Sequence, residues 1–204
     1  MRDRRAVIGI VFALGFPALP ISALYDEFAN VSHLIGYELI WWAAVAFVLD
    51  YVRAVERQPL ATIGFRWPSA RDLAIGIAAG VAILVALGAL SAVVPPDHTA
   101  LAQLVATPLW WQIASVIRAA VGEEVLFRGY ALERLATVTR RPRLAALVSW
   151  AVFTVEHVGY WGWGHLVIAG LGGALLTGLY LWRRNLWVAI LAHAIVDGAA
   201  LLAA

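Results

Sequence analysis

The chain has 204 residues, of which 63% are hydrophobic and only 14% are charged, a balance outside the range of soluble domains and typical of multi-span membrane proteins. All 15 basic residues are Arg, and they form clusters between apolar runs rather than a basic stripe, which excludes a nucleic-acid partner. Because the chain has no cysteine, disulfides, thiolate metal sites and cysteine nucleophiles are excluded as well.

Seven apolar runs predict seven transmembrane helices, and hence an all-α, polytopic membrane helix bundle surrounded by the lipid bilayer. The runs lie at about 6–25, 34–52, 73–94, 108–134, 144–158, 165–182 and 186–204. Pro17 and Pro20 predict a kink in the first run. That run is near full membrane length and does not end in a small-residue cleavage site, so we interpret it as a retained helix rather than a signal peptide.

The arginine clusters predict the orientation of the bundle, because basic residues are retained on the cytoplasmic side of a membrane. The clusters occupy 2–5, 53–71, 134–143 and 183–184. All of them fall on one side if the amino terminus is cytoplasmic, which places the carboxyl terminus outside and leaves only Arg118 and Arg128 within the membrane. Without a linker or repeat, 1–204 is expected to form a single membrane domain. The Arg-only, Ala-rich composition suggests a bacterial cytoplasmic membrane.

Three ionisable residues, Glu123, Glu124 and Arg128, interrupt the fourth apolar run. A charge near the centre of a membrane helix costs about 2.5–3.5 kcal/mol on insertion scales, so such residues indicate a functional site by default. Glu124 and Arg128 are four residues apart and could form an ion pair with a purely structural role. Glu123 lies about 140° around the helix from Arg128 and has no partner on this run, which favours a functional role for it.

The last three runs contain few ionisable residues: Glu156, His157, His165, His193 and Asp197. A spacing of four places His193 and Asp197 on one helix face, and Phe153 and His157 on one face of another helix. A single histidine in a membrane often only makes a hydrogen bond between helices. Together with Glu123, however, His157 and His193 predict a buried polar cavity that opens toward the cytoplasm or laterally to lipid.

Two hydrolytic chemistries fit such a cavity. In the first, Glu123 is a general base that acts with His157 to deprotonate a water, while His193, oriented by Asp197, donates to the developing oxyanion. In the second, His157, His193 and a glutamate such as Glu123 bind a divalent metal such as zinc, whose bound water is the nucleophile. The chain lacks a His-Glu-x-x-His helix, which weakens the metal hypothesis without excluding it.

The three motifs Glu123-Glu124-x-x-x-Arg128, Phe153-x-x-x-His157 and His193-x-x-x-Asp197 resemble those of the CAAX prenyl endopeptidase and bacteriocin-processing (CPBP) family of intramembrane proteases, also called abortive-infection proteins. The resemblance implies catalytic core spans in 108–204 and accessory spans in 1–107. It implies that Glu123 and His157 activate water, that His193 and Asp197 form an oxyanion hole, and that Glu124, Arg128 and Phe153 support the site. It also implies a membrane-associated peptide or protein substrate, such as a prenylated CAAX-type protein or a leader peptide.

One position departs from the family pattern, because the prenyl endopeptidase branch has Asn where Asp197 stands. An ionised carboxylate would repel an oxyanion, so Asp197 must be protonated or must act through His193. Members of the family are often described as metalloproteases, although a metal-free, glutamate-activated mechanism has been argued for the prenyl endopeptidases. We favour the metal-free mechanism and expect no cofactor, with zinc as the alternative.

Two functions without hydrolysis remain as alternatives. The chain could be an immunity or scaffold protein that binds a toxin or a partner helix without catalysis. Buried Glu, His and Asp residues also form proton relays in transporters, but the chain has no evident inverted repeat, which weighs against a transporter. An isosteric change of Glu123 to Gln distinguishes a protease, which it inactivates, from a scaffold, which tolerates it.

Overall fold

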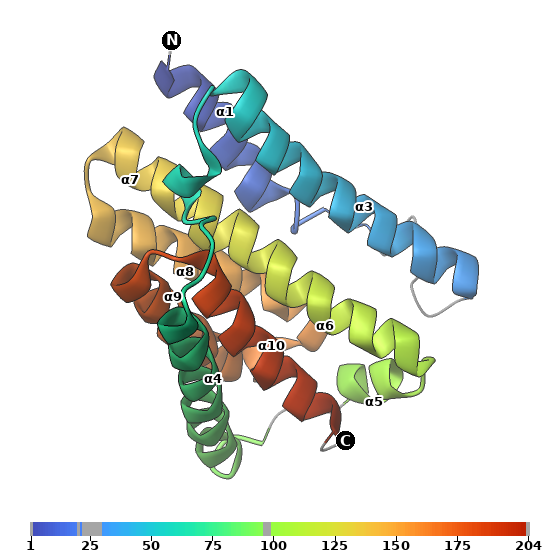
Figure 1. The fold of residues 1–204 in the computed structure, drawn as a ribbon. Helices are drawn as coiled ribbons and strands as arrows, with labels where there is room; N and C mark the ends of the chain where they lie inside the picture. Colours follow the sequence, from blue (N-terminus) through green and yellow to red (C-terminus); the bar gives the residue numbers. More distant parts are fainter. Residues whose placement is uncertain (1, 20, 22–29, 96–98, 203–204) are drawn as a thin grey trace.

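The computed structural model describes residues 2–19, 21, 30–95 and 99–202, and this part of the chain is 86% helical, with no strand. The α-helices are α1 (Arg2–Gly15), α3 (Val31–Asp50), α4 (Ala70–Ser91), α5 (Thr99–Val105), α6 (Leu109–Glu123), α7 (Glu133–Thr139), α8 (Pro142–Trp161), α9 (Leu166–Arg183) and α10 (Leu186–Leu202) (Figure 1). Segments of π- or 3-10 helix adjoin or connect them: η1 (Tyr51–Val55), η2 (Leu60–Ile63), η3 (Glu124–Leu132) and η4 (Trp163–His165). The predicted all-α class is confirmed.

The described helices follow the predicted apolar runs, with three informative differences. Helix α1 ends at Gly15 and does not continue as a kinked span, because Pro17 disfavours helix at its own position and at the residue before it. Positions 20 and 22–25 of that predicted span lie outside the described residues. A short helix, α5, lies between the third and fourth runs, where none was predicted, and the fourth run contains the π-helix η3.

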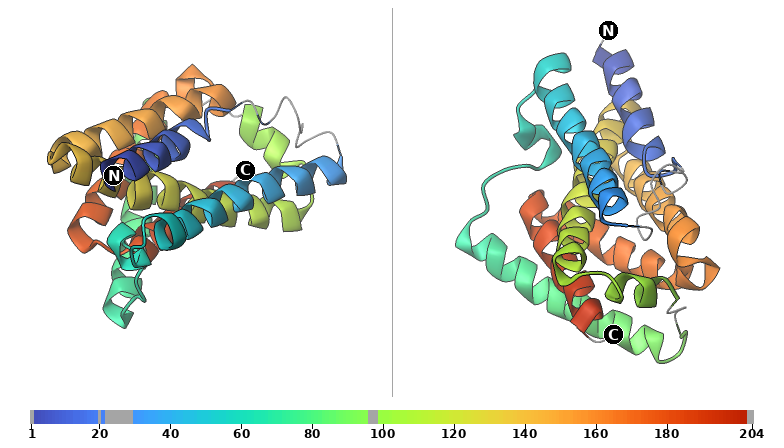
Figure 2. Two further views of the ribbon diagram at one scale, coloured as in Figure 1. Left: turned by 90° about the horizontal axis from the view of Figure 1, so that it is seen from above. Right: turned by 90° about the vertical axis from the view of Figure 1, so that its right-hand side faces the viewer.

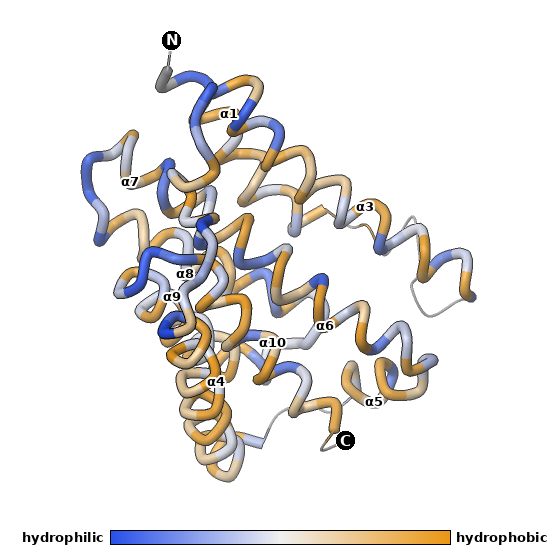
Figure 3. Tube along the Cα trace, viewed as in Figure 1, coloured by the Kyte–Doolittle hydropathy of each residue, from blue (hydrophilic) through white to orange (hydrophobic). Residues whose placement is uncertain are grey.

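Several helices have the length and apolar surface that a bilayer requires. The segments Val31–Val55, Ala70–Ser91 and Trp163–Arg183 are long and apolar enough to cross a membrane, and Leu186–Leu202 is a shorter apolar helix. On α4, the outward side chains of Ile77, Val81 and Val85 are 51%, 50% and 66% exposed, an apolar face typical of lipid contact. Figure 3 shows the same hydrophobic character along most of α4. The count of seven spans and the cytoplasmic amino terminus stay predictions.

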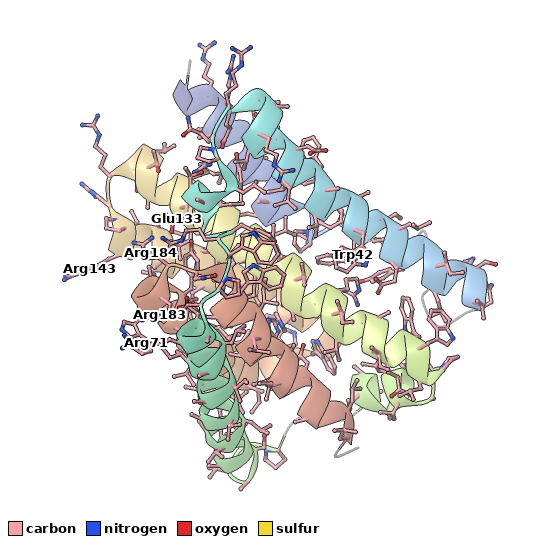
Figure 4. All side chains as sticks on the ribbon, viewed as in Figure 1. Trp42, Arg71, Glu133, Arg143, Arg183 and Arg184 are labelled. Carbon is pink, nitrogen blue, oxygen red and sulfur yellow. The ribbon has the colours of Figure 1, made fainter. Side chains whose placement is uncertain are left out.

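The arginine clusters come together at one end of the bundle, which we call the arginine end. The contacts that join them are those of Arg5 with the Val55 carbonyl, Arg134 with Glu56, Arg183 with Asp72, and Arg184 with Glu133. Figure 4 shows Arg71, Arg143, Arg183 and Arg184 on this side of the molecule, and Figure 2 shows the two chain termini well apart. Helices α4, α8 and α10 begin at the arginine end, and α3, α7 and α9 run toward it.

The interior next to the arginine end is tightly packed. Gly64 has a left-handed φ of 76°, and a Cβ at this position would lie 2.7 Å from the Tyr180 ring, so that only glycine allows the contact. The Gly64 carbonyl accepts a hydrogen bond from the Leu186 N–H at 2.8 Å, and the Tyr180 hydroxyl donates to Glu133 at 2.8 Å. The connection between η1 and α4 is thereby held against the start of α10.

Candidate active site

The Glu-Glu motif lies where the fourth helix changes its winding. Glu123 is the last residue of α6, and Glu124 begins η3, a nine-residue π-helix in which every residue is buried. Turns of π-helix are rare and are frequent at functional sites. Their different hydrogen-bond pattern leaves backbone groups that need other partners, and the Ser149 hydroxyl of α8 donates to the Phe127 carbonyl at 2.8 Å. No pattern in the sequence predicted this winding.

The predicted ion pair between Glu124 and Arg128 is present and fully buried. Arg128 Nη1 donates to Glu124 Oε1 at 2.8 Å, and the two side chains are 1% and 0% exposed. Arg128 also donates to the Gly173 carbonyl at 3.2 Å and to Thr177 Oγ1 at 3.4 Å, while its guanidinium carbon lies 3.9 Å from the centre of the Phe153 ring. Buried charges are tolerated when they are paired and hydrogen-bonded, so these contacts fix the Arg128 side chain.

The same carboxylate orients His193 of α10. His193 Nδ1 lies 2.9 Å from Glu124 Oε1, the oxygen that also accepts from Arg128. Since an ion-paired carboxylate only accepts hydrogen bonds, Nδ1 carries the proton of this contact. The other ring nitrogen, Nε2, lies 3.9 Å from Glu123 Oε2 and 3.3 Å from Asp197 Oδ2. Glu124 therefore positions His193 in addition to pairing with Arg128.

His157 of α8 is oriented by its own helix. Its Nδ1 lies 2.7 Å from the Phe153 carbonyl, which can only accept, so Nδ1 is the donor and Nε2 of the neutral ring is an acceptor. Nε2 lies 4.0 Å from Glu123 Oε2. The Phe153 ring packs against the His157 ring with centroids 4.5 Å apart, and against Phe127 at 5.3 Å. Phe153 thus contacts both His157 and the guanidinium of Arg128.

Glu123, His157 and His193 converge, as the sequence led us to expect. Glu123 Oε2 is buried and has no hydrogen-bond partner among the described residues, and it lies 4.0 and 3.9 Å from the Nε2 atoms of the two histidines. These separations are too long for direct hydrogen bonds and match the gap that one bridging water spans. With side-chain exposures of 17%, 18% and 7%, the three groups are mostly buried, and two of them are reachable by water.

The three side chains lie in the wall of a cavity of about 890 Å³. The cavity is mainly apolar, and the charged and imidazole side chains in its wall are Arg118, Glu123, Glu156, His157, His165, His193 and Asp197. The predicted opening of the cavity, toward the cytoplasm or laterally to lipid, stays a prediction. The lining residues of α4, α9 and α10 come from the halves of these helices that lie farther from the arginine end, because packed side chains fill the nearer halves.

The donor types suit zinc, since both histidines have their second ring nitrogen held by an oxygen acceptor, as in many zinc sites. The separations do not suit zinc. Ligands at about 2.0–2.1 Å from a tetrahedral ion lie roughly 3.4 Å from one another, whereas Glu123 Oε2 stands 3.9 and 4.0 Å from the two nitrogens. No group of three or more His, Asp or Glu residues in the described ranges is arranged to hold a metal ion. These residues, as they stand, do not fit a metal site.

Sequence reasoning did not assign several residues that the structure brings to the site. Thr177 and the Gly173 carbonyl bind Arg128, and the only signal for them was the small-residue character of the sixth run. Glu156 and His165 were noted as polar but given no role. Both line the cavity, and each has a buried polar atom, Oε2 and Nδ1 respectively, without a hydrogen-bond partner in the described chain.

Comparison with protein families gives this geometry a context. Residues 105–199 match the family described as Rce1-like, type II CAAX prenyl endopeptidase, and the matched segment contains all three motifs. A search of curated proteins and a search of solved structures found no match. The matched family is one of proteases, and its members are membrane proteins. Over residues 105–199, a little under half of the chain, the sequence is similar to the Rce1-like group of the CPBP family, the resemblance that its motifs predicted.

Proposed function

We propose that this protein is an intramembrane endopeptidase that hydrolyses a peptide bond in a membrane-associated protein or peptide. The observation that carries the proposal is the position of Glu123 Oε2, 4.0 and 3.9 Å from the Nε2 atoms of two histidines whose Nδ1 atoms are both engaged. Around a space of the size of one water molecule, Glu123 Oε2 and His157 Nε2 can accept protons, and His193 Nε2 can donate a hydrogen bond.

Glu123 and His157 activate the water. A water between them donates one hydrogen bond to Glu123 Oε2 and the other to the unprotonated His157 Nε2, whose Nδ1 is occupied by the Phe153 carbonyl. As the water oxygen attacks the carbonyl carbon, its proton passes to Glu123, which acts as general base. When the C–N bond breaks, Glu123 returns this proton to the leaving amine, so that the glutamate is regenerated.

His193 stabilises the oxyanion that forms during the attack. Its Nδ1–H donates to Glu124, so the oxyanion is bound through Nε2, which must also carry a proton. Asp197 Oδ2 lies 3.3 Å from Nε2 and accepts a hydrogen bond from this N–H in the resting site. Asp197 then acts through His193, which removes the conflict between an acidic residue and an oxyanion.

The substrate class follows from the family and the cavity. The family indicates a membrane-associated protein substrate, and the mainly apolar wall is suited to an extended hydrophobic segment. A prenylated CAAX-type tail and a leader peptide are the two substrates that the motifs suggest. The metal-free chemistry predicts that purified protein treated with a strong chelator keeps its activity; loss of activity that added zinc restores would favour the metal mechanism.

The decisive experiment changes Glu123 to Gln. Membrane proteomics should find new protein termini in cells that express the intact chain, and these termini should disappear with Glu123→Gln, because the amide cannot accept the water proton. Glu156→Gln is the matched control, the same isosteric change in the same cavity but outside the three motifs, and it should keep the termini. An immunity or scaffold protein would tolerate Glu123→Gln, and an unchanged set of termini in that variant would overturn the protease proposal.

A further inference from the structure

The cavity has a second polar region, away from the three motifs, in the wall that α3 and α6 share. Figure 1 shows α3 beside α6, and the residues that line the cavity there are Tyr37 and Trp41 of α3 and Ser115 and Arg118 of α6. Arg118 is the only arginine among the described residues that line this cavity. Because α3 lies before residues 105–199, the family match does not account for this wall.

Arg118 holds a positive charge in a fixed position in this wall. Its Nε donates to Glu38 Oε1 at 2.8 Å, and the other oxygen of Glu38 accepts from Trp42 Nε1, also at 2.8 Å. The guanidinium carbon lies 5.0 and 5.3 Å from the centres of the Tyr37 and Trp41 rings, within the range of cation–π contact. The Arg118 side chain is still 13% exposed and lines the cavity, so a charged partner inside the cavity can reach it.

Two residues in the same wall have polar atoms without a partner. Trp41 and Ser115 are each 6% exposed, and Trp41 Nε1 and Ser115 Oγ make no hydrogen bond within the described chain. Ser115 precedes Arg118 by three residues and is therefore its neighbour on the surface of α6. An indole N–H can only donate, and a buried donor without an acceptor is costly. The wall thus offers one cation and additional donors to a group that accepts hydrogen bonds.

One peptide can reach both this wall and Glu123. Arg118 precedes Glu123 by five residues, which is about 8 Å along the axis of α6 and about 140° around it. Trp41 lies between the two places, because a Cβ at Gly122 would be 3.5 Å from Trp41 Cε3. An extended peptide advances about 3.3–3.6 Å per residue, so a group roughly two to four residues from the scissile bond can reach Arg118.

We propose that Arg118, together with Trp41 and Ser115, binds a carboxylate of the substrate and so selects peptides in which that carboxylate lies a short distance from the scissile bond. This inference rests on the proposed peptidase function. A carboxylate is the acceptor that suits a guanidinium best, and the carboxylates of Glu123 and Asp197 would repel it elsewhere in the cavity. An Asp or Glu side chain and the free carboxyl terminus of a substrate offer the same chemistry.

Binding can be measured without cleavage in the full-length Glu123→Gln protein, purified in detergent. The probes are three fluorescently labelled forms of one peptide, rich in alanine and leucine, whose last residue is glutamine: the free acid, the carboxamide, and the carboxamide with glutamate in place of the glutamine. Fluorescence anisotropy gives the Kd of each. A carboxylate probe should bind about tenfold more tightly than the neutral carboxamide. Tighter binding of the free acid identifies the carboxyl terminus as the source, and tighter binding of the glutamate form identifies a side chain.

Variants of the wall show whether the preference comes from this site. Adding Arg118→Gln together with Glu38→Gln removes the cation without leaving a buried carboxylate unpaired, and should make the three Kd values similar. Ser115→Ala should weaken binding of the carboxylate probe several-fold and leave the carboxamide unchanged. Ser91→Ala is the matched control, because Ser91 also lines the cavity but belongs to α4; it should change neither.

The proposal is overturned if the three probes bind equally, if none of them binds, or if the preference for a carboxylate survives the loss of Arg118 and Glu38. Because binding is measured in a protein that lacks Glu123, its result does not depend on proteolysis. A preference that requires Arg118, combined with protein termini in cells that do not change with Glu123→Gln, would reject the protease function and keep the carboxylate site. Loss of those termini without any preference would keep the protease function and reject the carboxylate site.

Discussion

Arg128 shows how one side chain can organise a site without entering the chemistry. It neutralises Glu124, donates to the Gly173 carbonyl and to Thr177, and lies against the Phe153 ring. Through Glu124 it reaches His193 Nδ1, and through Phe153 it reaches His157. The orientation of both histidines therefore depends on a residue that does not face Glu123 in the cavity.

Changing Arg128 to Ala should destabilise the protein by about 3–5 kcal/mol, because the buried Glu124 carboxylate loses its partner. Arg128→Lys should be milder, since it keeps the charge and loses only the planar fork and the stacking on Phe153. Thermal unfolding in detergent measures both effects. An Ala variant that unfolds at the wild-type temperature but has lost activity would instead assign Arg128 to the reaction.

Asp197 offers a test of the oxyanion site. If Asp197 acts only through His193, Asp197→Asn should retain most of the activity, because an amide oxygen still accepts from Nε2–H. His193→Ala, which removes the donor itself, should lower kcat by about 10²–10³-fold. Initial cleavage rates of the purified variants measure the difference. Equal losses in the two variants would show that the Asp197 charge is required, and would contradict its assignment as a positioning residue.

At the scale of elements, the site depends on the contact between α8 and α9. Gly173 of α9 has no side chain, so the Phe153 ring of α8 lies against its backbone. A Cβ at Gly173 would stand only 2.8 Å from Phe153 Cδ1, far closer than packed carbon atoms approach. The glycine at this position of the sixth run is thus explained by an aromatic ring that supports His157 and Arg128.

Gly173→Ala should therefore destabilise the protein by about 1–3 kcal/mol through overpacking, and should lower activity further by shifting Phe153. Gly178→Ala, on the same helix, is the matched control, because nothing lies within 4 Å of a Cβ at that position. This control should be neutral or slightly stabilising, as expected for Gly to Ala in a helix. Thermal unfolding and cleavage rate are compared for the two. Similar behaviour of both variants would show that the contact with Phe153 is not needed.

At the scale of the whole molecule, the arginine clusters lie at one end of the helix bundle. Ion pairs and the packed Gly64–Tyr180 contact join the helix ends that carry arginine, while the cavity is lined by the halves of α4, α9 and α10 farther from them. Figure 3 shows hydrophilic stretches at the turn after α7 and between α9 and α10, and hydrophobic helices between the two ends. Tight packing is thus concentrated at the arginine end, and the cavity lies toward the other end.

A reporter fused after Ala204 that is active only in the cytoplasm should be silent, because α10 begins at the arginine end and runs away from it. The matched fusion after Arg184, at the arginine end, should be active. Reporter activity measured in intact cells distinguishes the two positions. An active fusion after Ala204 would mean that the arginine end does not face the cytoplasm alone, or that one predicted span does not cross the membrane.

Much of the fold was predictable because membrane helices are coded locally. Apolar runs placed α3, α4, α8, α9 and α10, since each run satisfies its own backbone hydrogen bonds within lipid. The π-helix η3 and the short helix α5 were not predictable, because both depend on contacts with other helices. The end of α1 at Gly15 was missed because the effect of Pro17 was judged as a kink rather than a stop.

The sequence by itself determined the class of the bundle, the positions of the arginine clusters, the Glu124–Arg128 pair and the family that residues 105–199 resemble. These features follow from local spacing and composition. The tertiary structure alone decided that Glu124 also holds His193, that Glu123 stands 3.9 and 4.0 Å from two histidines, and which halves of α4, α9 and α10 line the cavity. These depend on distances between helices far apart in the chain, which the packing of side chains such as Phe153 against Gly173 sets and no local pattern encodes.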